Sequence, residues 1–179
     1  MRTISVSVVV GNPKANSRTL EVAKTLAECL LVPGTYDMSV IDLAEHAGDI
    51  FDQTAASVNE AVARVAGSDL AIFAAPTYKA AYTGLLKAFL DRYPSDGLSG
   101  VTAIPLLTGA DLGHSLAPSA TLTPLLTELG AVVPGRGFYF VTSQMDSMRD
   151  IVQRAAEVYV RNMGQVARLL PVLADQEQA

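Results

Sequence analysis

Several features that mark other classes of protein are scarce or missing in this sequence of 179 residues. There is one cysteine, Cys29, which excludes a disulfide framework and a cysteine-rich metal site, and which we interpret as a small buried apolar residue of a helix. Asp and Glu outnumber Lys and Arg by 18 to 13, so no basic surface favours nucleic acid as a partner. No segment approaches the roughly 18 consecutive apolar residues of a membrane span. These absences favour the reducing cytoplasm as the compartment.

What is present is a regular alternation of two patterns. The first residues, MRTISVSVVVGNP, have no small-residue cleavage site, and we expect a first strand there rather than a signal peptide. Short β-rich apolar runs then alternate with segments of helical periodicity, which is typical of a parallel sheet covered by helices on both faces. The expected strands are 3–10, 36–43, 69–76, 100–108 and an interrupted 131–141; the expected helices are 17–31, 55–68, 83–93, 117–130 and 146–170.

This alternation predicts one α/β domain over residues 1–179, a three-layer sandwich with a parallel sheet of flavodoxin-like order 2-1-3-4-5. Half of the residues are hydrophobic, which is enough for a sizeable core. We expect Asp146 or Ser147 to cap the last helix and residues 172–179 to fray. Ligands of such sheets bind at the carboxyl ends of strands 1 and 3, so chemistry is expected in the loops after strands 1, 3 and 4.

The first of these loops, GNPKANS, leads from the first strand into a helix. Gly11 allows a close turn, and the unpaired amides of the first helical turn attract an anion. The additional donors and cations are Asn12, Lys14, Ser17, Arg18 and Thr19. The loop lacks the patterns of Walker A and of dinucleotide-binding turns, and it suits a terminal phosphate monoester. The alternative is an ordinary strand–helix turn with a good N-cap.

The second loop, APTYKAAYTG, places two tyrosines and a lysine between a buried strand and a helix. Pro76 ends the strand, and threonine and tyrosine beside exposed backbone amides suit a flat heteroaromatic ring with polar edges. Alternatively, Tyr78 and Tyr82 cover the edge of the domain or an oligomer interface, and both interpretations can hold together.

The third loop, LLTGADLGHSL, has two glycines that let the backbone approach a ligand, and it contains His114. A lone histidine serves either as a structural donor or as a catalyst. The other histidine, His46, follows the second strand near Asp42, Glu45 and Asp49, which we interpret as a solvated surface cluster.

Motifs for a nucleophile or a metal are otherwise missing. The sequence has no Gly-x-Ser-x-Gly elbow, no His-Glu-x-x-His and no Cys-x5-Arg of small phosphatases. A phosphate-binding domain without these groups indicates that a cofactor carries the reaction.

Together the three loops resemble the NADPH-dependent FMN reductases of the flavodoxin-like superfamily, and most closely those that serve two-component sulfonate monooxygenases. GNPKANSRT is similar to the family's Gly-Ser-Pro-Arg-x-x-Ser phosphate loop. PTYKAAYTGLLKAFLD matches the family's Pro-x-Tyr-x-x-x-Tyr-Ser-Gly-x-Leu-Lys segment almost position for position, and PLLTGADLGHSLA matches Pro-Leu-x-Thr-Gly-Gly-x-x-x-His. The likeness covers roughly residues 3–140.

The resemblance implies a site for FMN. The residues that would hold its phosphate are Asn12, Lys14, Ser17 and Thr19. Those that would run along the ribityl chain and ring are Pro76, Thr77, Tyr78 and Lys79. Thr108 and Gly109 would border the isoalloxazine, and His114 would lie near the face where nicotinamide stacks.

Some residues depart from the family pattern. Asn12 and Lys14 replace serine and arginine, so the bidentate fork of arginine is lost and phosphate binding would be looser. Ala110 replaces the second glycine of Thr-Gly-Gly. Some sulfonate-linked members carry an additional tyrosine in the fourth helix, tied to a π-type bulge and to flavin hand-off, and Ala120 stands at that position here. This last difference argues against that specific role.

The resemblance also implies an activity. NADPH or NADH would deliver hydride to FMN, and the reduced flavin would supply a monooxygenase. The choice of nicotinamide stays open, since Arg18, Lys79 or Arg136 could bind the 2′-phosphate of NADPH. Family members are homodimers or homotetramers, and helix TGLLKAFLDRY is a candidate interface. The alternatives are an FMN-containing reductase of quinones, azo dyes or metal ions, and a non-enzymatic FMN electron carrier.

Overall fold

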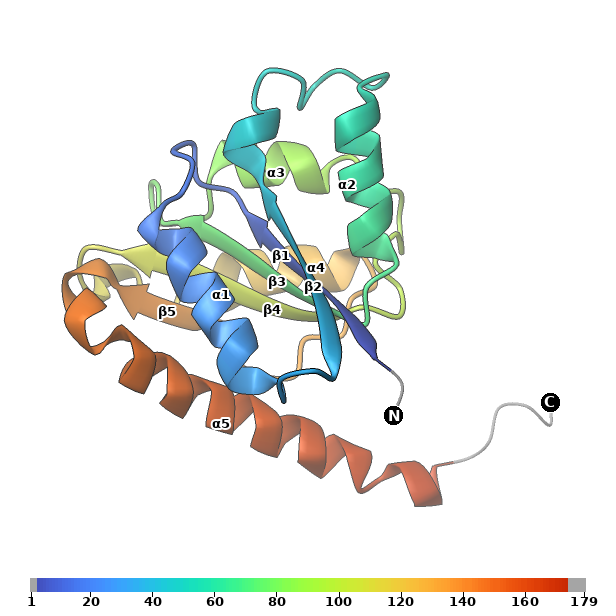
Figure 1. Cartoon of the computed structure of the whole chain (residues 1–179), viewed down its shortest axis with the longest axis vertical. Coiled ribbons are helices and arrows are strands. Elements are labelled where there is room, and N and C mark those ends of the chain that lie inside the picture. Colours follow the sequence, from blue (N-terminus) through green and yellow to red (C-terminus); the bar gives the residue numbers. More distant parts are fainter. Residues whose placement is uncertain (1–2, 174–179) are drawn as a thin grey trace.

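The computed structural model describes residues 3–173 and is built around a five-stranded sheet in which all neighbouring strands are parallel (Figure 1). The strands are β1 (Ile4–Val10), β2 (Tyr36–Asp42), β3 (Leu70–Pro76), β4 (Thr102–Gly109) and β5 (Phe138–Val141). Their order in the sheet is β2-β1-β3-β4-β5. The predicted flavodoxin-like topology is therefore confirmed.

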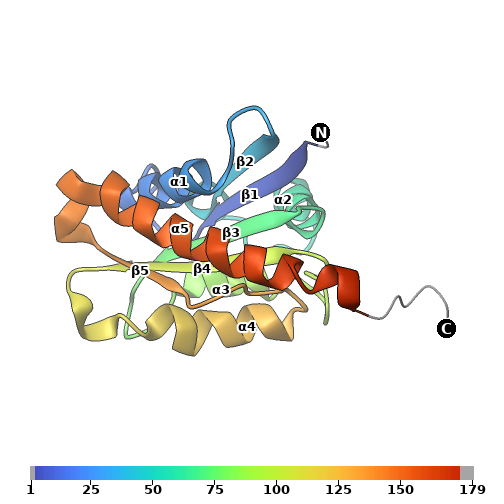
Figure 2. The same ribbon diagram turned by 90° about the horizontal axis from the view of Figure 1, so that it is seen from below.

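Helices cover both faces of the sheet and make the expected three layers (Figure 2). One face carries α1 (Arg18–Leu30) and α5 (Met148–Ala167), and the other carries α2 (Ala56–Ala66), α3 (Gly84–Leu90) and α4 (Thr123–Glu128). Successive strand residues point to opposite faces, so Val8 and Ile72 pack toward α1 and α5 while Val9 and Phe73 pack toward the other three helices. Both faces are apolar, as the near-continuous hydrophobic strands predicted.

The expected helix 117–130 divides into two parts. Its first part is a π-type turn, Pro118–Leu122, in which the Thr123 amide donates to the Pro118 carbonyl five residues back, and α4 follows. Pro124 explains the division, because it has no N–H to continue an α-helical ladder from Ala120. The π-type turn is therefore present in this chain, and it contains Ala120.

The expected strand 131–141 is interrupted more deeply than its pattern suggests. Val132 makes an isolated bridge to Thr102, and the chain then leaves the sheet until β5 begins at Phe138. Pro134 cannot donate to the ladder. At Gly135 a side chain would lie 2.6 Å from the Asn162 amide nitrogen of α5, so the segment bends past that helix without one.

The other elements begin and end within three residues of their expected limits. Ser147 occupies the cap position of α5, although its side chain makes no capping hydrogen bond. The tail expected to fray is residues 172–179. Its first two residues, Val172 and Leu173, both donate their amides to the Leu169 carbonyl. Residues 174–179 lie outside the described part. Cys29 is half-buried rather than fully buried. Within residues 3–173 no helix has the length and apolar character needed to cross a membrane.

The register of the sheet brings several strand ends to one edge. Val10 lies beside Asp42, Pro76 beside Thr108, and Gly109 beside Val141. The loops that follow β1, β3, β4 and β5 therefore leave the sheet next to one another, and the candidate site lies between them.

Candidate functional site

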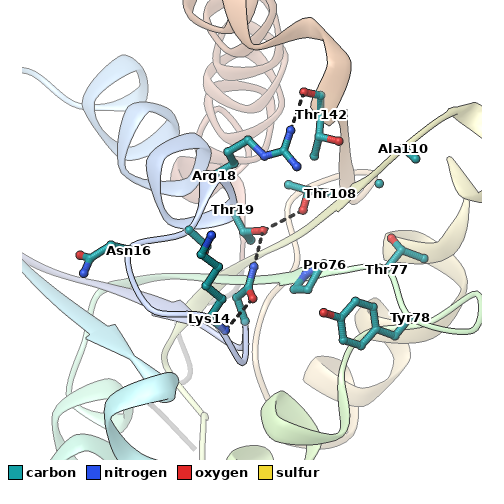
Figure 3. Close-up of a pocket in the computed structure, with 13 residues that line it drawn as sticks. Lys14, Asn16, Arg18, Thr19, Pro76, Thr77, Tyr78, Thr108, Ala110 and Thr142 are labelled. Atoms are coloured by element: carbon teal, nitrogen blue, oxygen red, sulfur yellow. Dashed lines mark hydrogen bonds between the residues drawn. The ribbon is translucent and has the colours of Figure 1, made fainter.

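A cleft of about 440 Å³ opens at this carboxyl edge of the sheet (Figure 3). Four connections contribute to its lining: the β1–α1 loop with the first turn of α1, the β3–α3 loop, the end of β4, and the residue after β5. The lining residues are Asn12, Lys14, Asn16, Ser17, Arg18, Thr19, Pro76, Thr77, Tyr78, Thr108, Gly109, Ala110 and Thr142. All predicted site residues are among them except Gly11, Lys79 and His114.

The loop between β1 and α1, residues 11–17 and here called the anion loop, forms one wall. Gly11 starts the loop beneath the cleft, where its N–H donates to the Ala74 carbonyl at 2.7 Å and its carbonyl accepts from the Thr83 hydroxyl at 2.5 Å. A Cβ at this position would lie 2.5 Å from the Leu86 Cβ. Gly11 thus lets α3 pack closely against the loop, a structural role that differs from the predicted ligand contact.

A chain of polar side chains links the anion loop to the floor of the cleft. The Lys14 amide donates to Asn12 Oδ1 at 2.9 Å, and Asn12 Nδ2 donates to Thr19 Oγ1 at 3.4 Å. Thr19 Oγ1 lies 2.8 Å from Thr108 Oγ1, and both threonines are buried (Figure 3). These contacts hold the β1–α1 connection against the end of β4.

The start of α1 faces the same cleft. Ser17 is the N-cap, and its hydroxyl accepts from the Leu20 amide at 3.3 Å. The first N–H groups of a helix have no intrahelical partners and carry partial positive charge. Because Ser17, Arg18 and Thr19 all line the cleft, this end of the helix is available to an anion.

Two cations and no carboxylate line the cleft among the described residues. Lys14 and Arg18 are both exposed, and Arg18 Nη1 donates to the carbonyl of Thr142 at 3.3 Å, so its guanidinium reaches across to the turn after β5. In a protein of net charge −5, this is a local concentration of positive charge. Anion recognition here rests on aimed donors rather than on the field of the whole protein.

The β3–α3 loop forms the other wall, opposite Lys14, Arg18 and Thr19 in Figure 3. After Pro76, the Thr77 amide donates to the Thr108 carbonyl at 2.7 Å. The Thr77 hydroxyl oxygen is buried and has no hydrogen-bond partner among the described residues. Tyr78 is 52% exposed, so its ring remains free on one side. This wall offers a flat aromatic surface beside an unpartnered hydroxyl.

Lys79 does not line the cleft because of the turn in which it lies. Tyr78 and Ala81 exchange backbone hydrogen bonds, and the two residues between them have positive φ, 51° at Lys79 and 65° at Ala80. Positive φ at both central positions is the geometry of a type I′ turn. Its tip is exposed, and Lys79 is not among the residues that line the cleft.

His114 is likewise outside the cleft. It ends a short 3-10 turn, Leu112–His114, whose start is capped by the Asp111 carboxylate accepting from the Gly113 amide at 2.7 Å. Residues 110–116 are all exposed. The structure therefore brings Thr108 and Gly109 to the site but leaves His114 in solvent.

The space beside the Cα of Gly109 is filled by a side chain from β5. A Cβ at this position would lie 1.8 Å from the Tyr139 hydroxyl oxygen, so the ring of Tyr139 from β5 occupies the space of a side chain. The contact with Tyr139 is by itself enough to explain a glycine at this position.

Sequence reasoning missed three lining residues, Asn16, Ala110 and Thr142. The residue type of Asn16 could have indicated a special backbone position, because asparagine is favoured at positive φ. Asn16, the residue before the N-cap, does have a positive φ of 51°. Thr142 follows the end of β5, an edge position that the interrupted strand obscured.

The cluster around His46 is also different from the predicted solvated group. Glu45 and Asp49 are exposed and His46 is half-buried, but Asp42 is only 7% exposed. Its carboxylate accepts from the amides of Asn16 and Ala44. No group of three or more potential metal ligands is found within residues 3–173.

Known proteins resemble this chain in both sequence and structure. The family model of NADPH-dependent FMN reductases matches residues 4–146. An FMN reductase (NADPH) of Escherichia coli strain K12 is 41% identical over 78 residues, which are 44% of this chain and 41% of that protein. The NADH-dependent FMN reductase SfnF of Pseudomonas putida is 28% identical over 149 residues, 80% of each chain.

Among solved structures, the apo form of an NADH:FMN oxidoreductase is 32% identical and superposes with a TM-score of 0.79, over 88% of this chain and 89% of that one. The chain spans about two fifths of the length of the Escherichia coli relative, but most of the length of the other two. Since the family model covers residues 4–146 and this solved structure is matched over most of its length, the chain belongs to the NADPH-dependent FMN reductase family.

Proposed function

We propose that the protein is an NAD(P)H-dependent FMN reductase, which transfers hydride from a nicotinamide to FMN. The observation that carries this proposal is the composition of the cleft: a wall of hydroxyls, helix-start amides and two cations without a carboxylate faces a wall with an exposed tyrosine ring. A phosphate monoester needs the first kind of wall, and a flat ring needs the second. FMN has both groups at its two ends.

The residues present fit FMN in this orientation. The phosphate would be held by Asn12, Lys14, Ser17, Arg18 and Thr19, and the ring by Pro76, Thr77, Tyr78, Thr108 and Gly109. The buried hydroxyl of Thr77, which lacks a partner among the described residues, would gain one from a polar edge of the ring or ribityl chain. Bound FMN supplies the hydride-accepting chemistry, and the protein binds, orients and partly shields the two reactants.

Lys79 and His114 do not line the cleft. They lie on the segments that flank it, where we propose that they contact the nicotinamide or a second subunit. Relatives named for NADPH and for NADH both match this chain, and we propose that either nicotinamide can donate the hydride. We further propose a cytoplasmic location, a single domain over residues 1–179 and the supply of reduced FMN to a monooxygenase.

We also infer that the protein is a homodimer or homotetramer. Tyr78, Leu112 and Leu116 are 52%, 69% and 73% exposed and lie on the two loops that follow β3 and β4. A second copy of the chain would cover apolar surface there. Light scattering that gives a monomer mass at micromolar concentration would contradict this part of the proposal.

The test of the activity is to mix purified protein with FMN and either NADPH or NADH and to follow the nicotinamide absorbance. Steady oxidation that saturates with FMN is expected. The same assay after gel filtration, with a quinone in place of added FMN, distinguishes the alternative of a reductase with retained flavin. If neither nicotinamide is oxidised in the presence of FMN or quinone, the proposal is wrong.

A further inference from the structure

Asp42 stands out because it is a buried acid close to the wall proposed to bind an anion. It ends β2 and lies in register beside Val10, the last residue before the anion loop. It is 7% exposed and does not line the cleft. A negative charge at this place does not itself attract phosphate, so its presence needs another explanation.

Both oxygens of the Asp42 carboxylate accept hydrogen bonds from backbone amides. Oδ1 accepts from Ala44 at 3.3 Å, which caps the 3-10 turn Leu43–His46 and orients the carboxylate from the side of β2. Oδ2 accepts from Asn16 at 3.0 Å, across 26 residues of sequence. The carboxylate therefore ties the second half of the anion loop to the strand beside it.

The residue that Asp42 holds has a left-handed backbone conformation. Asn16 has φ of 51°, a region that asparagine enters more readily than most non-glycine residues but that still differs from the usual helical and extended conformations. It immediately precedes Ser17, so its conformation sets the direction in which the N-cap and the first turn of α1 enter the cleft. A hydrogen bond to an ionised acceptor is among the stronger that a backbone amide can make.

We infer that Asp42 is a positioning residue for phosphate binding, which fixes Asn16 in its left-handed conformation and so presents Ser17 and the first amides of α1 to the phosphate of FMN. This inference rests on the proposed function. A loop that is ordered before binding loses less conformational freedom when the ligand arrives. Asp42 acts through Asn16 and makes no contact with the ligand.

Asp42→Asn is the main test, because Asn16 and Ala44 donate to different carboxylate oxygens, and replacing one of these oxygens by an NH2 group sets a donor against one of the two N–H groups. The loss of one charge-assisted hydrogen bond is expected to raise the dissociation constant and the KM for FMN roughly tenfold, with kcat little changed. Riboflavin, which has no phosphate, should bind the wild type and the variant alike. Binding is measured by flavin fluorescence, and Tm is measured in parallel.

A second substitution tests the mechanism. Glycine adopts positive φ readily, so Asn16→Gly should make the loop less dependent on Asp42. The effect of Asp42→Asn on FMN binding should then be clearly smaller when residue 16 is glycine than when it is asparagine. Asp69→Asn is the matched control: Asp69 accepts from the Ser5 amide at 2.8 Å at the opposite edge of the sheet, so this change should lower Tm but not alter the KM for FMN.

Three results would overturn the inference while leaving the proposed function intact: FMN binding unchanged in Asp42→Asn, FMN and riboflavin weakened equally, or tighter FMN binding, which would mean that charge repulsion dominates. If Asp42→Asn fails to fold, Asn16→Gly and Asn16→Ala are compared instead, with Asp42 left unchanged. Equal FMN affinity of these two variants, despite different Tm values, would show that φ at residue 16 does not matter for binding. That result would also overturn the inference. A wild-type protein that does not bind FMN would refute the proposed function, and the inference with it.

Discussion

The two walls of the cleft are built in different ways. The anion loop is held by hydrogen bonds to several other elements: β3 through Ala74, the start of α3 through Thr83, and β2 through Asp42. The turn of residues 78–81, by contrast, is closed by hydrogen bonds between its own first and last residues, and its tip is exposed.

This difference matches the needs of the two ends of the proposed ligand. A phosphate is small and tetrahedral, and its binding gains most from donors that are fixed in advance. A ring is recognised over a broad flat surface and tolerates a wall that a neighbouring subunit or a second substrate can complete. Changes to the anion loop should therefore affect both the fold and the affinity for FMN, whereas changes at the tip of the turn should affect neither strongly.

Gly11→Ala should have the largest effect, because it breaks the contact between the anion loop and α3. The new Cβ would lie 2.5 Å from the Leu86 Cβ, and relief requires the backbone to shift. We expect a loss of about 3 kcal/mol in the free energy of unfolding, measured by urea denaturation, and weaker FMN binding. Gly48→Ala is the control, since a Cβ there meets no atom within 4 Å. Equal losses in the two variants would show that the close packing at Gly11 is unimportant.

Ser17→Ala should have an intermediate effect that separates binding from stability. The hydroxyl caps α1 by accepting from Leu20, and its loss is expected to lower the free energy of unfolding by about 1 kcal/mol. Loss of a direct phosphate contact should in addition weaken FMN binding roughly tenfold, measured by fluorescence titration. Ser147→Ala, at the start of α5 where the side chain makes no capping hydrogen bond, should change neither quantity. Unchanged FMN affinity in Ser17→Ala would place the phosphate elsewhere.

Ala80→Gly should have the smallest effect and would sharpen the contrast between the walls. Glycine relieves the left-handed conformation at φ of 65°, but it also gives the unfolded chain more freedom. The net change in the free energy of unfolding should stay within about 1 kcal/mol, and FMN affinity should not change. Ala80→Val, with a β-branched residue at positive φ, should lower Tm instead. A severalfold change in FMN affinity in Ala80→Gly would mean that the turn is as closely tied to the ligand as the anion loop.

Much of the site was predictable because parallel strands end at one edge. Once β1, β3 and β4 were recognised, the residues after them had to meet, and Asn12, Ser17, Thr77 and Thr108 do line one cleft. Lys79 lies outside the cleft lining because its position depends on a turn with two residues at positive φ, which the sequence YKAA, without glycine or asparagine, does not predict. His114 lies outside the lining because a capped 3-10 turn follows β4 and leaves that segment exposed.

The sequence by itself determined the features that depend on residues close together along the chain. The periodicity of strands and helices and the cap of α1 by Ser17 depend on neighbours up to about one helical turn away, so they can be read along the chain. Only the tertiary structure decided which side chains fill the space beside Gly11 and Gly109 and which amides Asp42 binds. These roles depend on Leu86, Tyr139 and Asn16, which the fold brings into contact from distant positions, and distance along the chain carries no information about which side chain will fill a given space.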